Sequence, residues 1–231
     1  PIFDDKDVHA IGSLAIAPSD AEIIYAGTGE TSIRSNVSLG NGMWRSTDGG
    51  ETWDHIGLEN SGRIGRVVVH PDDPDVVWAA VLGHGYTPQK DRGIWKTTDG
   101  GQNWKHVLFV DENTGASDVE INPANPRILY AGMWHLELKT WNRTSGGPGG
   151  GLFKSTDGGE TWKRLKGSAL PKKSVGKIAI TVTPANPDRV YALIETGDGA
   201  PLDGEETESG ELWRSDDRCG FPADGRAGAA R

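Results

Sequence analysis

The sequence is poor in the residues that mark several large classes of protein. It has a single cysteine, Cys219, so no disulfide can form within the chain. No apolar run approaches the roughly 20 residues that a membrane-spanning helix needs. Acidic residues outnumber basic ones by 33 to 24, a net charge of −9. The basic residues form no stripe, which argues against nucleic acid and against insertion into a membrane or binding to its anionic surface.

Motifs of several common enzyme classes are also missing. There is no Gly-x-Ser-x-Gly nucleophile elbow, no His-Glu-x-x-His zinc motif and no Gly-x-x-x-x-Gly-Lys-Ser/Thr phosphate loop. The glycine run at 146–151 has no lysine after it and precedes an expected strand, so it does not suit a phosphate. We therefore expect no cofactor and no metal, and we assign no catalytic residue from motifs.

Glycine and tryptophan, by contrast, are abundant, with 33 and 9 copies. Many of them belong to an eight-residue turn of the form Ser/Thr-x-Asp-Gly-Gly-x-x-Trp. Copies begin at Ser46, Thr97 and Ser155, which are 51 and 58 residues apart. A fourth copy begins 60 residues later at Ser215 and breaks off after Asp217. This spacing predicts repeated supersecondary units.

The residue types explain how such a turn would form. A Gly-Gly pair supplies positive φ at low steric cost, and the aspartate before it can accept hydrogen bonds from backbone amides ahead of it. Apolar pairs precede each copy and predict a strand that enters a hairpin. Acid catalysis or calcium binding is the functional alternative to this structural role, but an EF-hand would need further acidic ligands and a closing glutamate. The turn residues are Ser46, Asp48, Gly50, Trp53, Thr97, Asp99, Gly101, Trp104, Ser155, Asp157, Gly159 and Trp162.

These three copies resemble the Asp-box, or BNR, repeat of sialidase-like and sortilin-type β-propellers, in which the box is a peripheral structural turn. A longer pattern is similar to bacterial sortilin-type repeat proteins that are often labelled glycosyl hydrolase-like. It consists of Ile11-Gly12, Ala17-Pro18-Ser19-Asp20, Tyr25 to Glu30 and Gly40-Asn41-Gly42. The resemblance covers about residues 1–217. It implies an extracytoplasmic location, although no signal segment is visible in the chain.

No stretch has helical periodicity, and the expected fold is all-β. Each unit supplies four antiparallel strands, one propeller blade, and about four blades of a larger propeller are present. The other blades of the parent protein are thus expected partners.

Residues 1–10 are interpreted as the last strand of a preceding blade and a linker. Blades are expected at 11–60, 61–115, 116–170 and 171–217, the last with a broken box. Residues 218–231 are expected to be an unstructured tail, from a divergent end or a frameshifted reading frame.

The expected order of the strands places the connections between them at two opposite edges of the blades. The short turns between first and second strands share one edge with the boxes, and the long loops and between-blade segments share the other. Functional groups tend to lie on loops held by a rigid scaffold, so we expect a site on the long-loop face. The ligand-binding candidates are Glu30, Arg34, His84, Tyr86, Trp134, His135, Trp141 and Arg143.

Each of these candidates also has an ordinary structural interpretation. Trp134 and Trp141 could stack on a sugar or a peptide side chain, or could pack a long loop. Glu30 with Arg34 could bind a ligand or form a loop ion pair. The histidines could be satisfied surface groups.

Three functions are compatible with such a scaffold. The leading interpretation is a non-catalytic module that binds a peptide, protein or glycan on the long-loop face. The alternative is a glycoside hydrolase of the sialidase or xyloglucanase kind, which would need two facing carboxylates, for example Glu30 with Glu137 or Glu195. Arg63-Ile64-Gly65-Arg66 lacks the proline of the sialidase Arg-Ile-Pro motif, which argues against sialidase chemistry. A third interpretation is an assembly factor.

Overall fold

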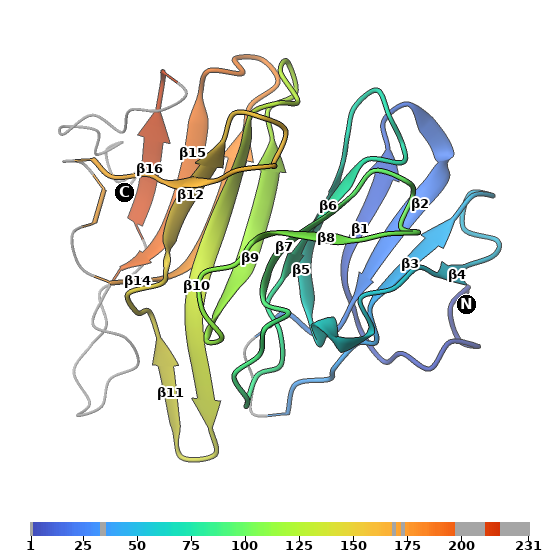
Figure 1. Cartoon of the computed structure of the whole chain (residues 1–231), viewed down its shortest axis with the longest axis horizontal. Helices are drawn as coiled ribbons and strands as arrows, with labels where there is room; N and C mark the ends of the chain where they lie inside the picture. Colours follow the sequence, from blue (N-terminus) through green and yellow to red (C-terminus); the bar gives the residue numbers. More distant parts are fainter. Residues whose placement is uncertain (1, 33–35, 168–169, 172–173, 197–210, 218–231) are drawn as a thin grey trace, which may run out of the picture.

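A computed structural model describes residues 2–32, 36–167, 170–171, 174–196 and 211–217, and these ranges are all-β apart from one short 3-10 helix, η1 (Glu59–Ser61) (Figure 1). No helix in them is long and apolar enough to cross a membrane. The expectations for Arg34 and for the tail at 218–231 fall outside the described residues.

Four antiparallel sheets follow one another along the chain. Blade 1 contains β1 (Ile11–Ala17), β2 (Asp20–Thr28), β3 (Met43–Ser46) and β4 (Asp54–His55). Blade 2 contains β5 (Ile64–Val69), β6 (Val77–Val81), β7 (Gly93–Thr97) and β8 (Lys105–Leu108). Blade 3 contains β9 (Thr114–Ile121), β10 (Leu129–Lys139), β11 (Asn142–Ser145), β12 (Gly151–Ser155) and β13 (Lys163–Arg164). Blade 4 contains β14 (Val175–Val182), β15 (Val190–Thr196) and β16 (Glu211–Ser215).

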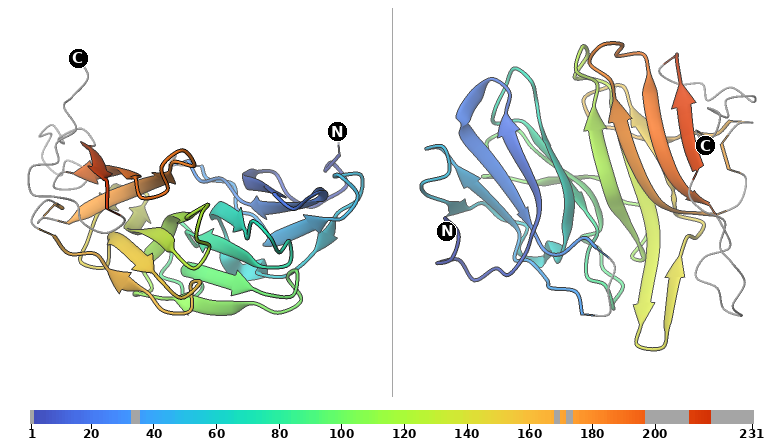
Figure 2. Two further views of the ribbon diagram at one scale, coloured as in Figure 1. Left: turned by 90° about the horizontal axis from the view of Figure 1, so that it is seen from above. Right: turned by 180° about the vertical axis from the view of Figure 1, so that it is seen from behind.

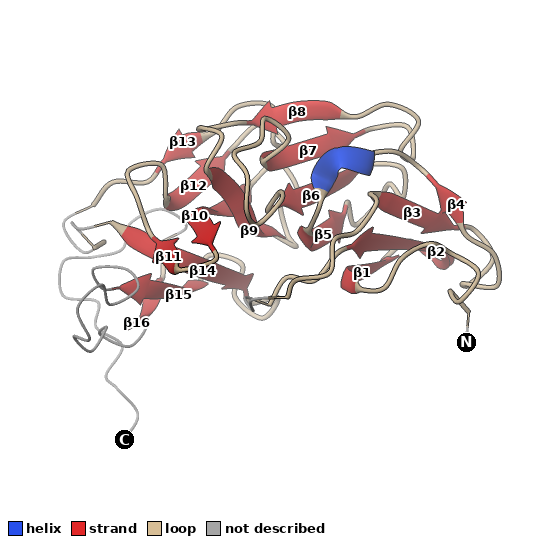
Figure 3. Cartoon of the chain, turned by 90° about the horizontal axis from the view of Figure 1, so that it is seen from below, coloured by secondary structure: helices blue, strands red, loops and turns tan. Residues whose placement is uncertain are grey.

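The four blades form an arc, with the first strand of each on the concave side (Figure 3). Along that side β1 contacts β5, β5 contacts β9, and β9 contacts β14. Blades 1 and 4 lie at opposite ends of the arc (Figure 2). The fold is that of neighbouring propeller blades, as the Asp-box resemblance implied.

Apolar side chains fill the space between blades. Strand β6 shows how, because successive side chains of a strand point to opposite faces. Val77, Ala79 and Val81 pack toward blade 1, whereas Trp78 and Ala80 pack toward blade 3. A central strand buried on both faces therefore has a continuous apolar sequence.

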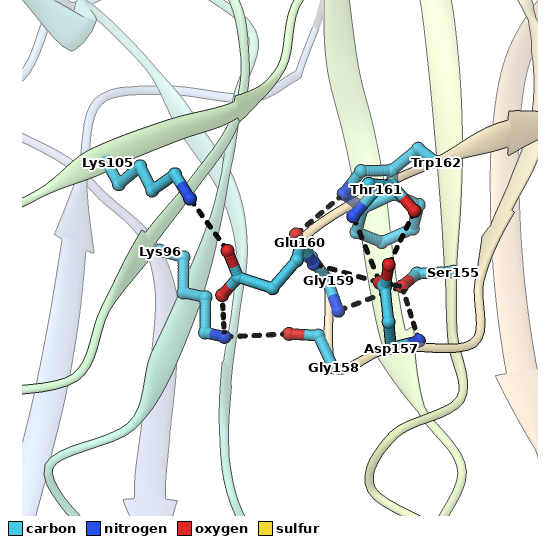
Figure 4. Close-up of polar contacts among 9 residues, drawn as sticks. All are labelled: Lys96, Lys105, Ser155, Asp157, Gly158, Gly159, Glu160, Thr161 and Trp162. Carbon is cyan, nitrogen blue, oxygen red and sulfur yellow. Dashed lines mark hydrogen bonds and ion pairs between the residues drawn. The ribbon is translucent and has the colours of Figure 1, made fainter.

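Each intact Asp box is held by the bonds that its residue types allow. In the third box the Ser155 hydroxyl donates to Asp157 Oδ1 at 2.7 Å and accepts from the Gly159 N–H at 2.9 Å. Asp157 Oδ1 also accepts the Thr161 N–H, and the Trp162 indole donates to the Gly159 carbonyl (Figure 4). The first two boxes repeat the hydroxyl and carboxylate bonds. Both oxygens of each aspartate therefore accept hydrogen bonds from residues of the same turn.

The same bonds set the acidity of the box aspartates. The pKa of Asp48 is lowered to about 2, first by the Thr52 hydroxyl and then by the Thr52 N–H. The pKa of Asp99 falls to about 2 through the Asn103 side chain and backbone. These carboxylates are therefore ionised at neutral pH and are unsuited to act as general acids.

The boxes also join neighbouring blades. Glu160 of the third box accepts from Lys96 at 2.6 Å and from Lys105 at 2.7 Å, both on blade 2 (Figure 4). Lys96 also donates to the Gly158 carbonyl. Between blades 1 and 2 the Trp104 indole donates to the Ile56 carbonyl. This edge of the molecule is thus occupied by structural contacts.

Three expectations about boundaries need correction. Residues 2–10 contain no strand, and Phe3 instead packs edge-on against Trp44 and Trp53 of blade 1, with centroids 5.4 and 5.3 Å apart. Strand β9 begins at Thr114, inside the range expected for blade 2. One of the expected long loops, the connection between β10 and β12, is largely a hairpin, in which β10 pairs with β11.

Candidate functional site

The long-loop face lies at the edge of the blades opposite the Asp boxes, where the β10–β11 hairpin projects beyond the sheets (Figure 1). His84 and Tyr86 lie on the loop between β6 and β7, and Tyr86 is half-exposed. Trp141 lies at the tip of the hairpin and is 83% exposed. Arg143 follows it on β11 and is exposed.

Trp134 does not lie on this surface, and its assignment as a stacking residue is wrong. Every second side chain in this part of β10 belongs to one buried cluster, which contains Trp134, Leu136 and Leu138 together with Leu82. The Trp134 indole donates to Ser145 Oγ at 3.0 Å inside the protein. The ring is fully buried and has no face available to a ligand. The alternation of apolar residues from 134 to 138 was the signal for a strand.

A buried arginine brings the β6–β7 loop against β10. Arg92 Nη1 donates to the carbonyls of Asn113 and Leu136 at 2.6 and 3.0 Å. Its Nη2 donates to the carbonyls of His84 and Thr87 at 2.7 and 3.2 Å. Burial lowers the pKa of Arg92 to about 10, and the nearby carboxylates of Asp111 and Glu137 oppose that shift.

His135 connects two carboxylates at this junction. Its Nε2 lies 3.1 Å from Glu137 Oε1, and its Nδ1 lies 3.4 Å from the Thr114 hydroxyl. That hydroxyl donates to Asp111 Oδ2 at 2.9 Å. One chain of polar contacts therefore joins blade 3 to the segment that precedes it. The chain runs through Asp111, Thr114, His135 and Glu137.

The three carboxylates considered for hydrolysis have different surroundings. Glu30 accepts the Ser38 N–H at 3.2 Å and closes its own loop. Glu195 Oε2 accepts both the Lys177 N–H and the Ser145 hydroxyl, so its role is to join β11, β14 and β15. Glu137 contacts His135, and its side chain is 37% exposed. Of the three, Glu137 is the one whose carboxylate accepts no hydrogen bond from a backbone N–H.

The structure also contains two buried arginines that sequence reasoning missed. Arg63 and Arg92 are both fully buried, although arginine is rarely so. No pattern in the sequence separates them from surface arginines. In the described ranges no three His, Cys, Asp or Glu side chains are grouped to hold a metal ion.

A partly buried carboxylate lies on the concave side of the arc. Asp118 on β9 accepts the Ile180 N–H of blade 4 at 2.7 Å and lies 3.8 Å from Arg66 Nε. Its side chain is 14% exposed. Burial raises the pKa of Asp118 to about 6, against the lowering effects of the Ile180 N–H and Arg66.

We predict that Asp118→Asn stabilises the protein at pH 7.5 by about 2 kcal/mol and has little effect at pH 4. A raised pKa means that the folded state binds the proton more tightly than the unfolded chain. The charged side chain therefore lowers stability above about pH 6, and this cost disappears as the pH falls toward 4. Urea unfolding at both pH values measures the difference, with the exposed Asp72→Asn as control. Equal effects of Asp118→Asn at the two pH values would contradict the prediction.

Fold and Asp-box geometry together define an Asp-box β-propeller. A family model described as "Sortilin, neurotensin receptor 3" matches residues 41–169, and the chain belongs to this Sortilin-Vps10 family. The chain is 26% identical over 235 residues to a xyloglucanase of Paenibacillus sp., which covers 92% of this chain and 21% of that protein. It is 34% identical over 223 residues to a xyloglucanase of Acetivibrio thermocellus, which covers 66% of this chain and 25% of that protein.

A solved structure shares the fold. The GH74 xyloglucanase from Xanthomonas campestris superposes with a TM-score of 0.62 at 20% identity, over 89% of this chain and 28% of that one. The chain thus spans about a quarter of the length of the relatives that it matches.

Proposed function

We propose that the chain forms part of a glycoside hydrolase of the propeller type that acts on a xyloglucan-like polysaccharide. The observation that carries the proposal is the similarity to xyloglucanases across 92% of the chain, a share that requires most of its blades to align. This replaces the non-catalytic module as the favoured interpretation. Because a polysaccharide of this size cannot cross a membrane unaided, we also propose an extracytoplasmic location.

On this proposal the long-loop face binds the glycan. Trp141 presents an open ring at the hairpin tip, and such a ring stacks on the apolar face of a sugar. Glu137 supplies a carboxylate at the base of the same hairpin, beside His135. Glycoside hydrolysis uses two carboxylates on opposite sides of the scissile bond. Glu137 is proposed as one of them.

The test replaces Glu30, Glu137 and Glu195 singly by glutamine in the full-length protein. Glu137→Gln is expected to lower turnover on xyloglucan by ~10²-fold or more, because a carboxylate in general acid–base catalysis contributes about that much. The exposed Glu112→Gln on the same face is the matched control and should retain full activity. Full activity of Glu137→Gln with an unchanged unfolding midpoint would remove Glu137 from catalysis.

The Sortilin-Vps10 match favours a second candidate, a module that binds a peptide or protein without catalysis. The two candidates differ in one readout. A binding module retains its ligand unchanged, whereas a hydrolase releases new reducing ends from a glycan. Absence of any hydrolysis, together with saturable binding of a peptide, would favour the second candidate.

A further inference from the structure

The Asp-box edge is hollowed at the seam between blades 1 and 2, between the structural contacts that join them. The hollow has a volume of about 420 Å³. Blade 1 contributes Arg45, Asp54 and Ile56 to its lining, and the second Asp box contributes Gln102 and Trp104. Clefts that bind small molecules have volumes of roughly 300–1,000 Å³. The hollow is therefore large enough to hold a ligand.

Trp104 differs from the tryptophans of the other two boxes. The Trp53 and Trp162 indoles donate to the carbonyl of the second glycine in their own turn, both at 3.1 Å. The Trp104 indole instead donates to the Ile56 carbonyl of blade 1 at 2.7 Å. The Ile56 side chain covers the second glycine of this box, since a Cβ at Gly101 would lie 2.5 Å from Ile56 Cδ1. Trp104 thus spans the seam and is half-buried there.

A second hollow, of about 220 Å³, adjoins the first through Trp104, which lines both. It lies at the seam between blades 2 and 3, where Lys96 and Lys105 form ion pairs with Glu160 (Figure 4). Asn103 of the second box also lines it. A compact ligand would fill one hollow alone. A ligand that fills both must be an extended chain that passes Trp104.

The polar groups of the two hollows suit a neutral ligand. Arg45 is already paired with Asp75 Oδ1 at 2.6 Å, and Glu160 accepts from both lysines of the second hollow. These ion pairs leave little uncompensated positive charge for an anion. Asp54 and Gln102 are exposed, and their carboxylate and amide groups are of the kind that bonds to hydroxyl groups. An aromatic ring beside such groups is the combination that a sugar requires.

We propose that the two hollows form one groove, the Trp104 groove, which binds a neutral glucan chain remote from the long-loop face. Trp104 stacks on a sugar ring, and Asp54 and Gln102 bond to its hydroxyl groups. The choice of a glucan, rather than another neutral chain, rests on the proposed function. Because the groove lies at the edge opposite Trp141 and Glu137, it holds the polymer and takes no part in bond cleavage.

The test measures affinity for xyloglucan from the retardation of the full-length protein in native gels that contain the polysaccharide. Every sample carries Trp141→Ala, which weakens binding at the long-loop face. In this background Trp104→Ala is expected to raise the dissociation constant about fivefold, because one stacked aromatic contact is lost. Trp162→Ala is the matched control, since Trp162 also closes an Asp box but lines neither hollow. This control should retain the affinity.

Footprinting of the unaltered protein locates the contact directly. Saturating xyloglucan is expected to protect Trp104 from hydroxyl-radical oxidation and to leave Trp162, which is also half-buried, as reactive as before. Unchanged oxidation of Trp104 would overturn the proposal, as would a folded Trp104→Ala variant with unaltered affinity. If Trp104→Ala does not fold, the double variant Asp54→Ala/Gln102→Ala provides the same comparison, because both side chains are exposed.

Hydrolysis of xyloglucan is measured separately, as the release of reducing ends. Trp104→Ala should raise KM for the polymer and leave kcat unchanged, because the lost contact holds the chain equally before and during cleavage. If the protein hydrolyses xyloglucan without protecting Trp104, the Trp104 groove fails and the proposed function stands. If xyloglucan protects Trp104 but is not hydrolysed, the proposed function fails and the Trp104 groove stands.

Discussion

Replacing Arg92 by methionine is expected to lower the free energy of unfolding by about 3–5 kcal/mol, the usual cost of removing one member of a buried charged network. The substitution removes the Arg92 donor from four partly or fully buried carbonyls, those of His84, Thr87, Asn113 and Leu136. The Asn113 carbonyl still accepts the Leu136 N–H. Each buried acceptor that loses its bond costs about 1–3 kcal/mol, partly recovered by relaxation and water. The β6–β7 loop would then lose its attachment to β10.

Urea unfolding of the full-length protein measures this effect, and Arg63→Met is the matched control. Both arginines are fully buried and lie near one another, but one is satisfied and the other is not. The same substitution should therefore have opposite consequences at the two positions. A loss at Arg92 of less than about 1 kcal/mol would show that the loop is held by other contacts.

Trp134→Ala is expected to destabilise the protein by about 3–5 kcal/mol, as large-to-small changes in a core do. The ring fills the space between β10 and Leu82, so its removal leaves a cavity. The substitution also removes the indole donor to Ser145 Oγ, whose own hydroxyl donates to Glu195. The consequences would extend across the β10–β11 hairpin to β15.

Trp141→Ala is the control for this prediction, because the two tryptophans lie on the same hairpin and differ in exposure. Trp141 is 83% exposed, and its removal should change stability by less than about 0.5 kcal/mol. Its effect should appear in glycan binding instead. Similar losses of stability at both positions would mean that the hairpin tip is packed against something in solution.

Much of the architecture could be predicted from local chemistry. The Asp box specifies its own hydrogen bonds, so its presence identifies a hairpin wherever it occurs, as in the Ser155 to Trp162 turn. The continuous apolar sequence of β6, from Val77 to Val81, is typical of a central strand that is buried on both faces. The repeat spacing then predicted repeated supersecondary units, and the resemblance to Asp-box proteins implied that these units are propeller blades. These features depend on residues close in sequence, which is why they could be read without a structure.

The site was harder to predict because it depends on contacts between distant segments. Trp134 and Trp141 are seven positions apart. Trp134 is buried where β10 pairs with β9 and packs against Leu82, whereas Trp141 lies at the exposed tip of the β10–β11 hairpin. Arg63 and Arg92 are buried by a loop whose path the sequence does not show. The pairing of His135 with Glu137 requires a local geometry that residue types alone do not specify.

The most direct test of the proposed function is the release of reducing ends when the purified full-length protein is incubated with xyloglucan. We predict soluble oligosaccharide products, with Glu137→Gln slower by ~10²-fold and equally folded. A wild-type protein that is folded and binds xyloglucan but produces no new reducing ends from it or from other neutral glucans would contradict the account.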